Sequence, residues 1–215
     1  IEPAIPYVES IGIEMLPTEY VPWVPLDATP QLLRLSERGV DFVFIQGLLV
    51  AMGPVLKDAE RLGLLGKMQF CGNEYGVGET LIKMVGAGAE GYLSPKSYPW
   101  FDETDIPGIK LMLENQMKYH GKEMRVPEYC TWAAHGAIGC EAISRAIEKV
   151  GYENLDGRAV KEALDSMKDF DVYGVLKITY APEDHRGSNR VAIHQIKGGK
   201  IVRITDWQEA PMLVP

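Results

Sequence analysis

"VDFVFIQGLLVAMGPVLKDAERLGLLGKMQFCGNEYG", residues 40–76, is the stretch that decides the fold. It contains a nearly continuous apolar run at residues 42–45, a helix-like segment that ends at Gly63, and a second apolar run that leads into Cys71. An apolar run without polar alternation is typical of a strand that is covered on both faces. The short connections between strand, helix and strand favour a parallel sheet with flanking helices.

The same alternation extends to both sides of this stretch. Residues 12–23 are predicted to be extended, and residues 26–39 to form a helix with Pro30 in its first turn and Gly39 at its end. Residues 77–88 are predicted as a further helix and residues 89–95 as a further strand. Strands and helices therefore alternate along the first 93 residues, as in an α/β domain.

The second part of the chain has a different organisation. Long helices are predicted at residues 105–122, 127–151 and 156–169, followed by strands and by a hairpin whose turn contains Gly198 and Gly199. Residues 92–108 and 166–174 interrupt the regular succession of predicted helices and strands, and they are interpreted as crossings between two lobes. The predicted division places residues 1–92 and 177–215 in one α/β lobe, and residues 93–176 in part of another.

Composition excludes some classes of protein. The chain has 22 basic and 30 acidic residues and a net charge of −8, which argues against nucleic acid as a partner. No run approaches the ~20 apolar residues of a membrane span. The three cysteines are Cys71, Cys130 and Cys140, and they are interpreted as buried, inert thiols. The chain begins without Met, which suggests a processed or truncated product and leaves the compartment open.

The glycine-rich stretch at residues 69–79 lacks the features of a phosphate loop. Glu74 and Glu79 stand where a P-loop needs lysine, and Leu81 takes the place of the third glycine of a dinucleotide fingerprint. The four histidines are scattered, and there is no G-x-S-x-G sequence. We therefore predict no catalytic residue, no metal and no cofactor.

A recognition site is predicted at the carboxyl ends of two neighbouring strands, where parallel α/β sheets bind ligands. Glu74 is expected to meet a cationic group, while the glycines bring the backbone close to the solute; alternatively, Glu74 only caps the following helix. Aromatic side chains of residues 98–101 form either one wall of a cleft or the packing of the lobe junction. The predicted ligand-binding residues are Gln46, Leu48, Asn73, Glu74, Tyr75, Tyr98 and Trp100.

Several segments, taken in order, resemble one known family. They include "DATPQLLRLSERGVDFVFIQG", "MGPVLKDAERLGL", "FCGNEYG", "GAEGYLSPKSYPW" and "YCTWAAHGAIGCEAISRAIEKVG". Together with the closing residues 171–202 they are similar to the extracytoplasmic solute-binding proteins of ABC importers, in the leucine/isoleucine/valine-binding family. The resemblance implies a type I periplasmic-binding fold, with two lobes that are joined by hinge crossings and close on a ligand. It also implies that most of the first lobe is missing from this chain.

The resemblance assigns roles to individual residues. Glu74 matches the family's carboxylate for a ligand amino group, whereas Leu48 and Gln46 replace an aromatic residue and a glycine. These departures leave a leucine-like solute, another amino acid, and a small organic acid or amide all open. The implied function is capture of a small solute, without enzymatic activity, for delivery to an ABC permease. The implied location is periplasmic or extracellular, with a lipid anchor as an option. A ligand-sensing regulator on the same fold, or a nucleotide-dependent α/β enzyme, is the alternative.

Overall fold

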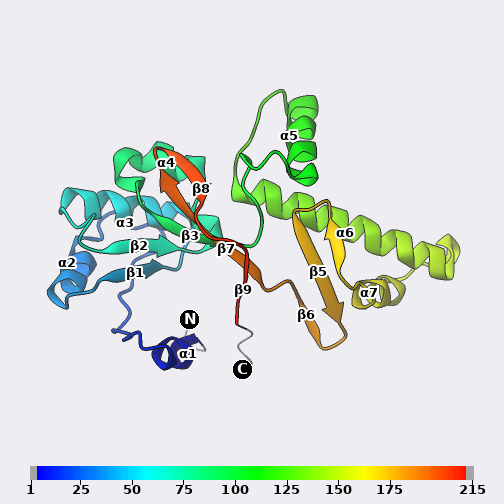
Figure 1. The fold of residues 1–215 in the computed structure, drawn as a ribbon, viewed down its shortest axis with the longest axis horizontal. Coiled ribbons are helices and arrows are strands. Elements are labelled where there is room, and N and C mark those ends of the chain that lie inside the picture. The colour runs from blue at the N-terminus through cyan, green and yellow to red at the C-terminus, as the bar shows by residue number, and fades with distance from the viewer. Residues whose placement is uncertain (1–3, 212–215) are drawn as a thin grey trace. The chain divides into compact units, whose positions relative to one another are not determined.

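Two compact units make up the described chain (Figure 1). The computed structural model describes residues 4–211. Unit 1 comprises residues up to 95 and from 193 onward, and unit 2 comprises residues 96–192. Both passages of the chain from one unit to the other occur inside strands, β3 and β7, which are neighbours in one sheet.

Unit 1 is built on a mixed sheet with the strand order β1-β2-β3-β7-β8, and β9 pairs with β7. β1 and β2 are parallel, as are β2 and β3, whereas β7 and β8 form an antiparallel hairpin. The sheet is therefore mixed, where the sequence predicted parallel sheets. Its helices are α1 (Ile5–Ser10), α2 (Thr29–Glu37), α3 (Leu49–Arg61) and α4 (Glu79–Val85), with 3-10 turns η2 (Glu74–Gly76) and η3 (Gly86–Ala89). Its strands are β1 (Phe42–Ile45), β2 (Gln69–Gly72), β3 (Leu93–Lys96), β7 (Arg190–Lys197), β8 (Lys200–Arg203) and β9 (Gln208–Glu209).

The β7–β8 hairpin turns at Gly198 and Gly199, whose φ angles are 59° and 70°. This left-handed backbone suits glycine and gives a twist that matches the strands. Glu90 fixes the turn from a distant part of the sequence, since its carboxylate accepts hydrogen bonds from the Gly198 and Gly199 N–H groups at 2.7 and 3.4 Å. The hairpin predicted from the two glycines is confirmed.

Unit 2 consists of three helices and a separate antiparallel sheet. The helices are α5 (Pro107–His120), α6 (Pro127–Val150) and α7 (Gly157–Asp165), with the 3-10 turn η4 (Tyr152–Asn154); the strands are β4 (Phe170–Val172), β5 (Leu176–Ala181) and β6 (Asp184–Gly187). Proline starts α5 and α6, and glycine follows both helices, as the sequence predicts. Asp156 caps α7, because its Oδ1 accepts a hydrogen bond from the Ala159 N–H at 2.8 Å.

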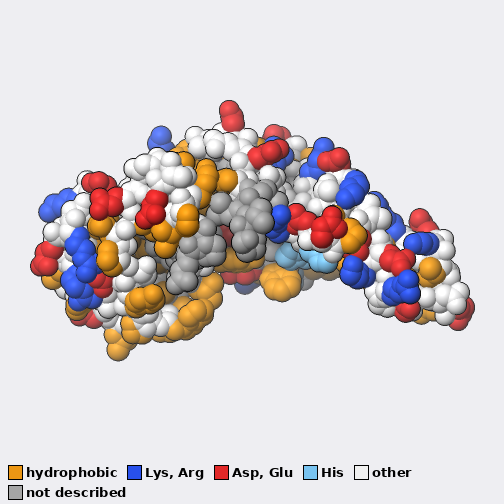
Figure 2. All heavy atoms as spheres, turned by 90° about the horizontal axis from the view of Figure 1, so that it is seen from below, with side chains coloured by type: hydrophobic (Ala, Val, Ile, Leu, Met, Phe, Trp, Pro, Cys, Tyr) orange, Lys and Arg blue, Asp and Glu red, His pale blue; other side chains and the backbone are white. Residues whose placement is uncertain are grey.

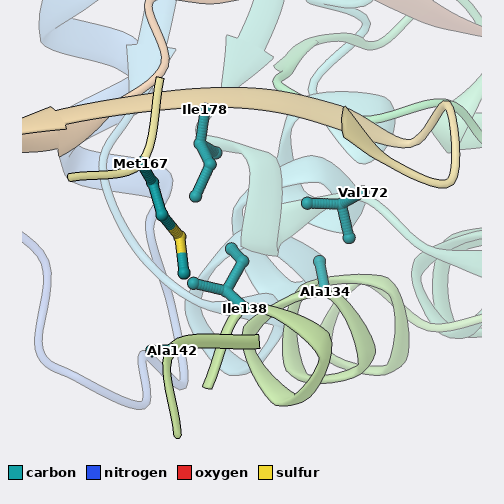
Figure 3. Packing of buried hydrophobic residues seen from close by; sticks show 6 residues of the cluster. All are labelled: Ala134, Ile138, Ala142, Met167, Val172 and Ile178. Carbon is teal, nitrogen blue, oxygen red and sulfur yellow. The ribbon is translucent and has the colours of Figure 1, made fainter. Parts of the chain in front are cut away.

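One face of α6 provides much of the core of unit 2. Ala134, Ile138 and Ala142 recur at a spacing of four residues and point toward Met167 and Ile178 (Figure 3). Val172 of β4 completes this cluster, and all six side chains are at most 5% exposed. The spacing of four residues thus places these side chains at the contact between α6 and the small sheet.

Two expectations differ from the structure. The chain returns to unit 1 at residue 193 rather than at 177, because β4, β5 and β6 hydrogen-bond with one another and pack on α6. The segment predicted to be extended at residues 12–23 contains no strand, and it runs as an irregular connection from α1 toward α2. Its polar anchor is Glu19, which forms ion pairs with Arg34 and Arg38 of the α2 region.

Unit 1 leaves apolar side chains in solvent. β1 ends the sheet, and its Phe42 and Phe44 are 53% and 45% exposed. Tyr20, Trp23 and Leu26 of the irregular connection are more exposed still. Figure 2 shows hydrophobic side chains gathered on the face of unit 1 that is seen from below. Such a surface is uncommon on a complete soluble domain.

Candidate solute-binding site at the carboxyl ends of β1 and β2

Strand register brings two predicted residues to one edge of the sheet. Ile45 and Gly72 are the last residues of the parallel strands β1 and β2, and they are partners in the ladder. Gln46 and Asn73 therefore follow as neighbours where the two strands end. Gln46 is exposed, and Asn73 is partly buried. The two amide residues thus follow adjacent strands at the same edge of the sheet.

Leu48 precedes α3 at this edge. It is the N-cap residue of the helix, its side chain is 42% exposed, and it offers no polar cap. Its carbonyl accepts hydrogen bonds from the N–H groups of Ala51 and Met52. The first N–H groups of a helix have no partner within the helix, and they carry a partial positive charge. The start of α3 can therefore meet an anionic or carbonyl group, with Leu48 as an apolar neighbour.

Asn73 holds the loop together through its backbone and leaves one side-chain atom unsatisfied. Its carbonyl accepts hydrogen bonds from Ser94 Oγ and from the Gly76 N–H, each at 3.2 Å. Its side-chain oxygen Oδ1 is buried and has no hydrogen-bond partner among the described residues. A buried acceptor without a partner is costly, and a water, an ion or a ligand group can supply the hydrogen bond that it needs. The sequence singled out Asn73 but gave no sign of this unsatisfied oxygen.

Glu74 and Tyr75 lie in the 3-10 turn η2 that follows β2, and both are partly buried. The turn places a carboxylate directly after the unsatisfied Asn73 oxygen. Glu79 belongs to the next helix, where its carboxylate lies 3.8 Å from the Lys83 ammonium. The two acidic residues of the glycine-rich stretch thus lie on different elements, and only Glu74 follows the strand end directly.

The glycines of the loop have a packing role that the sequence did not indicate. A Cβ at Gly76 would collide with the Met52 side chain, and a Cβ at Gly72 would lie 2.8 Å from the Ile45 carbonyl oxygen. Both glycines are buried. They let the loop sit against α3 and β1, where the sequence suggested that they bring the backbone close to a solute.

Tyr98 and Trp100 belong to unit 2 and are buried, each with 2% of its surface exposed. The Lys96 ammonium lies 4.6 Å from the centre of a Trp100 ring and 5.4 Å from that of Tyr98, within cation–π range. The backbone N–H of Trp100 donates to the Glu103 carboxylate at 2.9 Å. These contacts favour the packing interpretation of the aromatic cluster, and a contact of Tyr98 or Trp100 with a solute stays a prediction.

The buried thiols show no sign of chemical activation. Burial raises the pKa of Cys71 and that of Cys130 to about 12, so both are protonated at neutral pH. Burial, with a smaller effect of Cys71, raises the pKa of Tyr92. In contrast to the prediction that all three cysteines are buried, Cys140 is exposed on α6. Within residues 4–211, no three side chains of the metal-binding types group together as a metal site.

A cavity of about 280 Å³ lies elsewhere in unit 1. It is lined by Leu56 of α3, by residues 65–70 at the start of β2, and by Gly88 and residues 90–92 just before β3. The cavity is therefore at the amino ends of the strands, opposite the edge that carries Gln46 and Asn73. It does not coincide with the predicted site.

The arrangement of strands and loops was compared with known proteins. The family described as "Periplasmic binding protein" matches residues 2–200. The chain belongs to this family. It is a family of binding proteins, not of enzymes, and its members have the α/β fold with a mixed sheet that unit 1 displays. Among curated protein sequences none matches the chain significantly.

Solved structures of periplasmic binding proteins match almost the whole chain. A branched-chain amino acid ABC transporter protein from Thermus thermophilus with bound valine is 29% identical, with a TM-score of 0.84 over 96% of this chain. A leucine-binding protein from Thermotoga maritima is 18% identical with a TM-score of 0.74, and a fatty acid ABC transporter substrate-binding protein from Thermomonospora curvata is 17% identical with a TM-score of 0.77. The chain spans 56%, 55% and 54% of these proteins, respectively, so it corresponds to little more than half of each. None of the helices in residues 4–211 is both long and apolar enough to cross a membrane.

Proposed function

We propose that the full-length protein is the solute-binding component of an ABC-type importer, and that unit 1 recognises the polar head of a small solute through Asn73 and Glu74. Membership of the periplasmic binding protein family supports this proposal. The observation that carries it is the buried, unsatisfied Asn73 Oδ1, in the residue that precedes Glu74, where two parallel strands end. Such a protein works outside the cytoplasmic membrane, either free or through a lipid anchor, and delivers its solute to a membrane permease.

The chemistry of the edge defines the solute class. Asn73 Oδ1 and the Glu74 carboxylate both accept hydrogen bonds, so they fit a donor group such as an ammonium. The start of α3 fits a carboxylate or carbonyl group, and the exposed Leu48 side chain fits an apolar part. An amino acid with an aliphatic side chain combines these three features, and a small organic acid or amide offers two of them. The other lobe would close over the solute and stabilise the bound state.

Calorimetric titration of the full-length protein tests the proposal. The panel contains branched-chain and other amino acids, short organic acids, amides and aromatic acids. We expect an amino acid to bind, and we expect Glu74→Gln to weaken its binding about 10- to 100-fold, as for a lost charge-assisted hydrogen bond. Glu79→Gln is the matched control, because this carboxylate lies beside Lys83 on α4 and should leave affinity unchanged.

Three results would contradict the proposal. Equal loss of affinity in the Glu79→Gln and Glu74→Gln proteins would point to a general charge effect. Absence of binding across the panel together with turnover of a nucleotide would favour an enzyme. Solute binding by a protein whose deletion leaves uptake of that solute intact would favour a ligand-sensing regulator.

A further inference from the structure

Strand β3 carries the chain from unit 1 into unit 2 (Figure 1). The division between the units falls between Pro95 and Lys96, the last two residues of this strand. Proline has a fixed φ angle, and the residue that precedes a proline is restricted to extended backbone. Ser94 and Pro95 therefore form a stiff end to the part of β3 that belongs to unit 1.

Ser94 connects this end of the strand with the candidate site. Its side chain is buried, with 0% exposed surface. The hydroxyl Oγ lies 3.2 Å from the Asn73 carbonyl oxygen and 3.1 Å from the Pro95 carbonyl oxygen, so that its one proton can be donated to either acceptor. Asn73 belongs to the loop that follows β2 and precedes Glu74. A single buried hydroxyl thus holds the loop of the candidate site to the strand that leaves unit 1.

Lys96 holds the chain to unit 2 on the other side of Pro95. It has 0% exposed surface, which is rare for a lysine. Its ammonium contacts the rings of the buried Tyr98 and Trp100, at 5.4 and 4.6 Å from their centres. Burial raises the pKa of the Cys130 thiol, and the charge of Lys96 opposes this rise, which places the ammonium near the start of α6 as well. Lys96 is therefore fixed within the core of unit 2.

We propose that Ser94 and Lys96 are positioning residues, which clamp the chain on the two sides of Pro95 and make the Asn73 loop of unit 1 respond together with Trp100 of unit 2. The functional meaning of this connection rests on the proposed function, in which the Asn73 loop binds the solute. Occupation of the loop then changes the surroundings of Trp100 through β3, and a direct contact between Trp100 and the solute is not needed. One clamp is a hydrogen bond and the other a cation–π contact, so loss of either should interrupt the connection.

Fluorine NMR of the full-length protein, labelled with 5-fluorotryptophan, provides a readout at Trp100. The Trp100→Phe protein identifies the signal of this residue. Asn73→Gly perturbs the loop without any solute, because glycine has a wider range of backbone angles. We expect Asn73→Gly to shift the Trp100 signal in the otherwise unchanged protein. We expect the same substitution to cause no shift in proteins that also carry Ser94→Ala or Lys96→Met.

Two substitutions of the same kinds serve as controls. Ser36→Ala lies in α2, and Lys110→Met lies at an exposed position of α5. In proteins with either control substitution, Asn73→Gly should still shift the Trp100 signal by the full amount. Urea unfolding of each protein is measured in parallel. A purely structural role of Ser94 would lower the unfolding free energy but would leave the shift in place.

The outcomes decide between these roles. A Trp100 shift that Asn73→Gly causes alone, but not together with Ser94→Ala or Lys96→Met, supports the proposal. Absence of a shift in the Asn73→Gly protein, or an equal shift after either clamp is removed, would overturn it. Failure of the proposed function is a separate result, namely absence of solute binding in calorimetry, because the substitution experiment uses no solute.

Discussion

Gly72→Ala is the substitution with the most specific structural expectation. Gly72 ends β2, pairs with Ile45 of β1, and directly precedes Asn73 of the candidate site. A Cβ at this position would lie 2.8 Å from the Ile45 carbonyl oxygen and 2.7 Å from Met52 Cε, and it would collide with the Tyr92 hydroxyl. The end of Met52 can move, but the Ile45 carbonyl belongs to a strand that is held in the parallel ladder.

The expected magnitude follows from this overlap. Carbon and oxygen atoms normally approach no closer than roughly 3.3 Å, so the two strands must separate by about 0.5 Å at their ends. Overpacking of this kind costs about 1–3 kcal/mol of unfolding free energy. For a domain of this size, a cost of about 2 kcal/mol lowers the melting temperature by roughly 4–8 °C. Because Asn73 is the next residue, solute affinity should fall as well.

Urea unfolding and solute titration of the full-length protein measure both effects. Gly53→Ala is the matched control, because its Cβ would meet only Met84 Cε, at 2.7 Å, the end of a flexible and partly exposed side chain. Gly53 lies inside α3, where alanine is a better helix former than glycine. The unfolding free energy of the Gly53→Ala protein should therefore be unchanged or higher. A Gly72→Ala protein within about 0.5 kcal/mol of the wild type would refute the reasoning about the fixed Ile45 carbonyl.

Three further perturbations have clear expectations. Asp156→Ala removes the cap of α7 and should lower the unfolding free energy by about 0.5–2 kcal/mol in urea titrations, whereas Asp156→Asn should retain most of it. Ile138→Ala leaves a cavity between α6 and the small sheet, and it should lower the unfolding free energy by about 2–5 kcal/mol. A decrease below about 1 kcal/mol would argue against this packing. Burial raises the pKa of Cys71 and Cys130 from about 9 to about 12, so only the unfolded thiols ionise between these values. Stability should therefore be full below pH 9 and decrease from there toward pH 12, and Cys→Ala variants should show a smaller decrease.

The periodic parts of the fold could be read from the sequence. The strands β1 and β2, the spacing of Ala134, Ile138 and Ala142, and the hairpin at Gly198–Gly199 each depend on local sequence pattern or on one turn type. The burial of β1 on both faces was not confirmed, because β1 is an edge strand with Phe42 and Phe44 exposed. The return of the chain at residue 193 could not be read in the same way, because β5 and β7 are both short alternating strands. Their assignment to different sheets depends on contacts between residues that are distant in sequence.

The strand ends that carry the candidate site were predictable, but the surroundings of each residue were not. The ends of β1 and β2 follow from the strand assignment, which places Gln46 and Asn73 together. The unsatisfied Asn73 oxygen depends on which atoms surround the loop, and a sequence does not specify that environment. The burial of Tyr98 and Trp100 around Lys96 could not be predicted from the sequence either, because a Pro-containing aromatic segment fits both a cleft wall and a packed core.

The contact between Glu90 and the Gly198–Gly199 turn has a consequence for biosynthesis. Its partners are separated by 108 and 109 residues, and all of unit 2 lies between them in the sequence. During synthesis, β1, β2 and β3 leave the ribosome long before β7 and β8. The edge of β3 that later pairs with β7 therefore has no partner strand while unit 2 is translated. An edge strand without a partner is prone to association with other chains. Nascent chains that stop before residue 190 should consequently be the most dependent on chaperones.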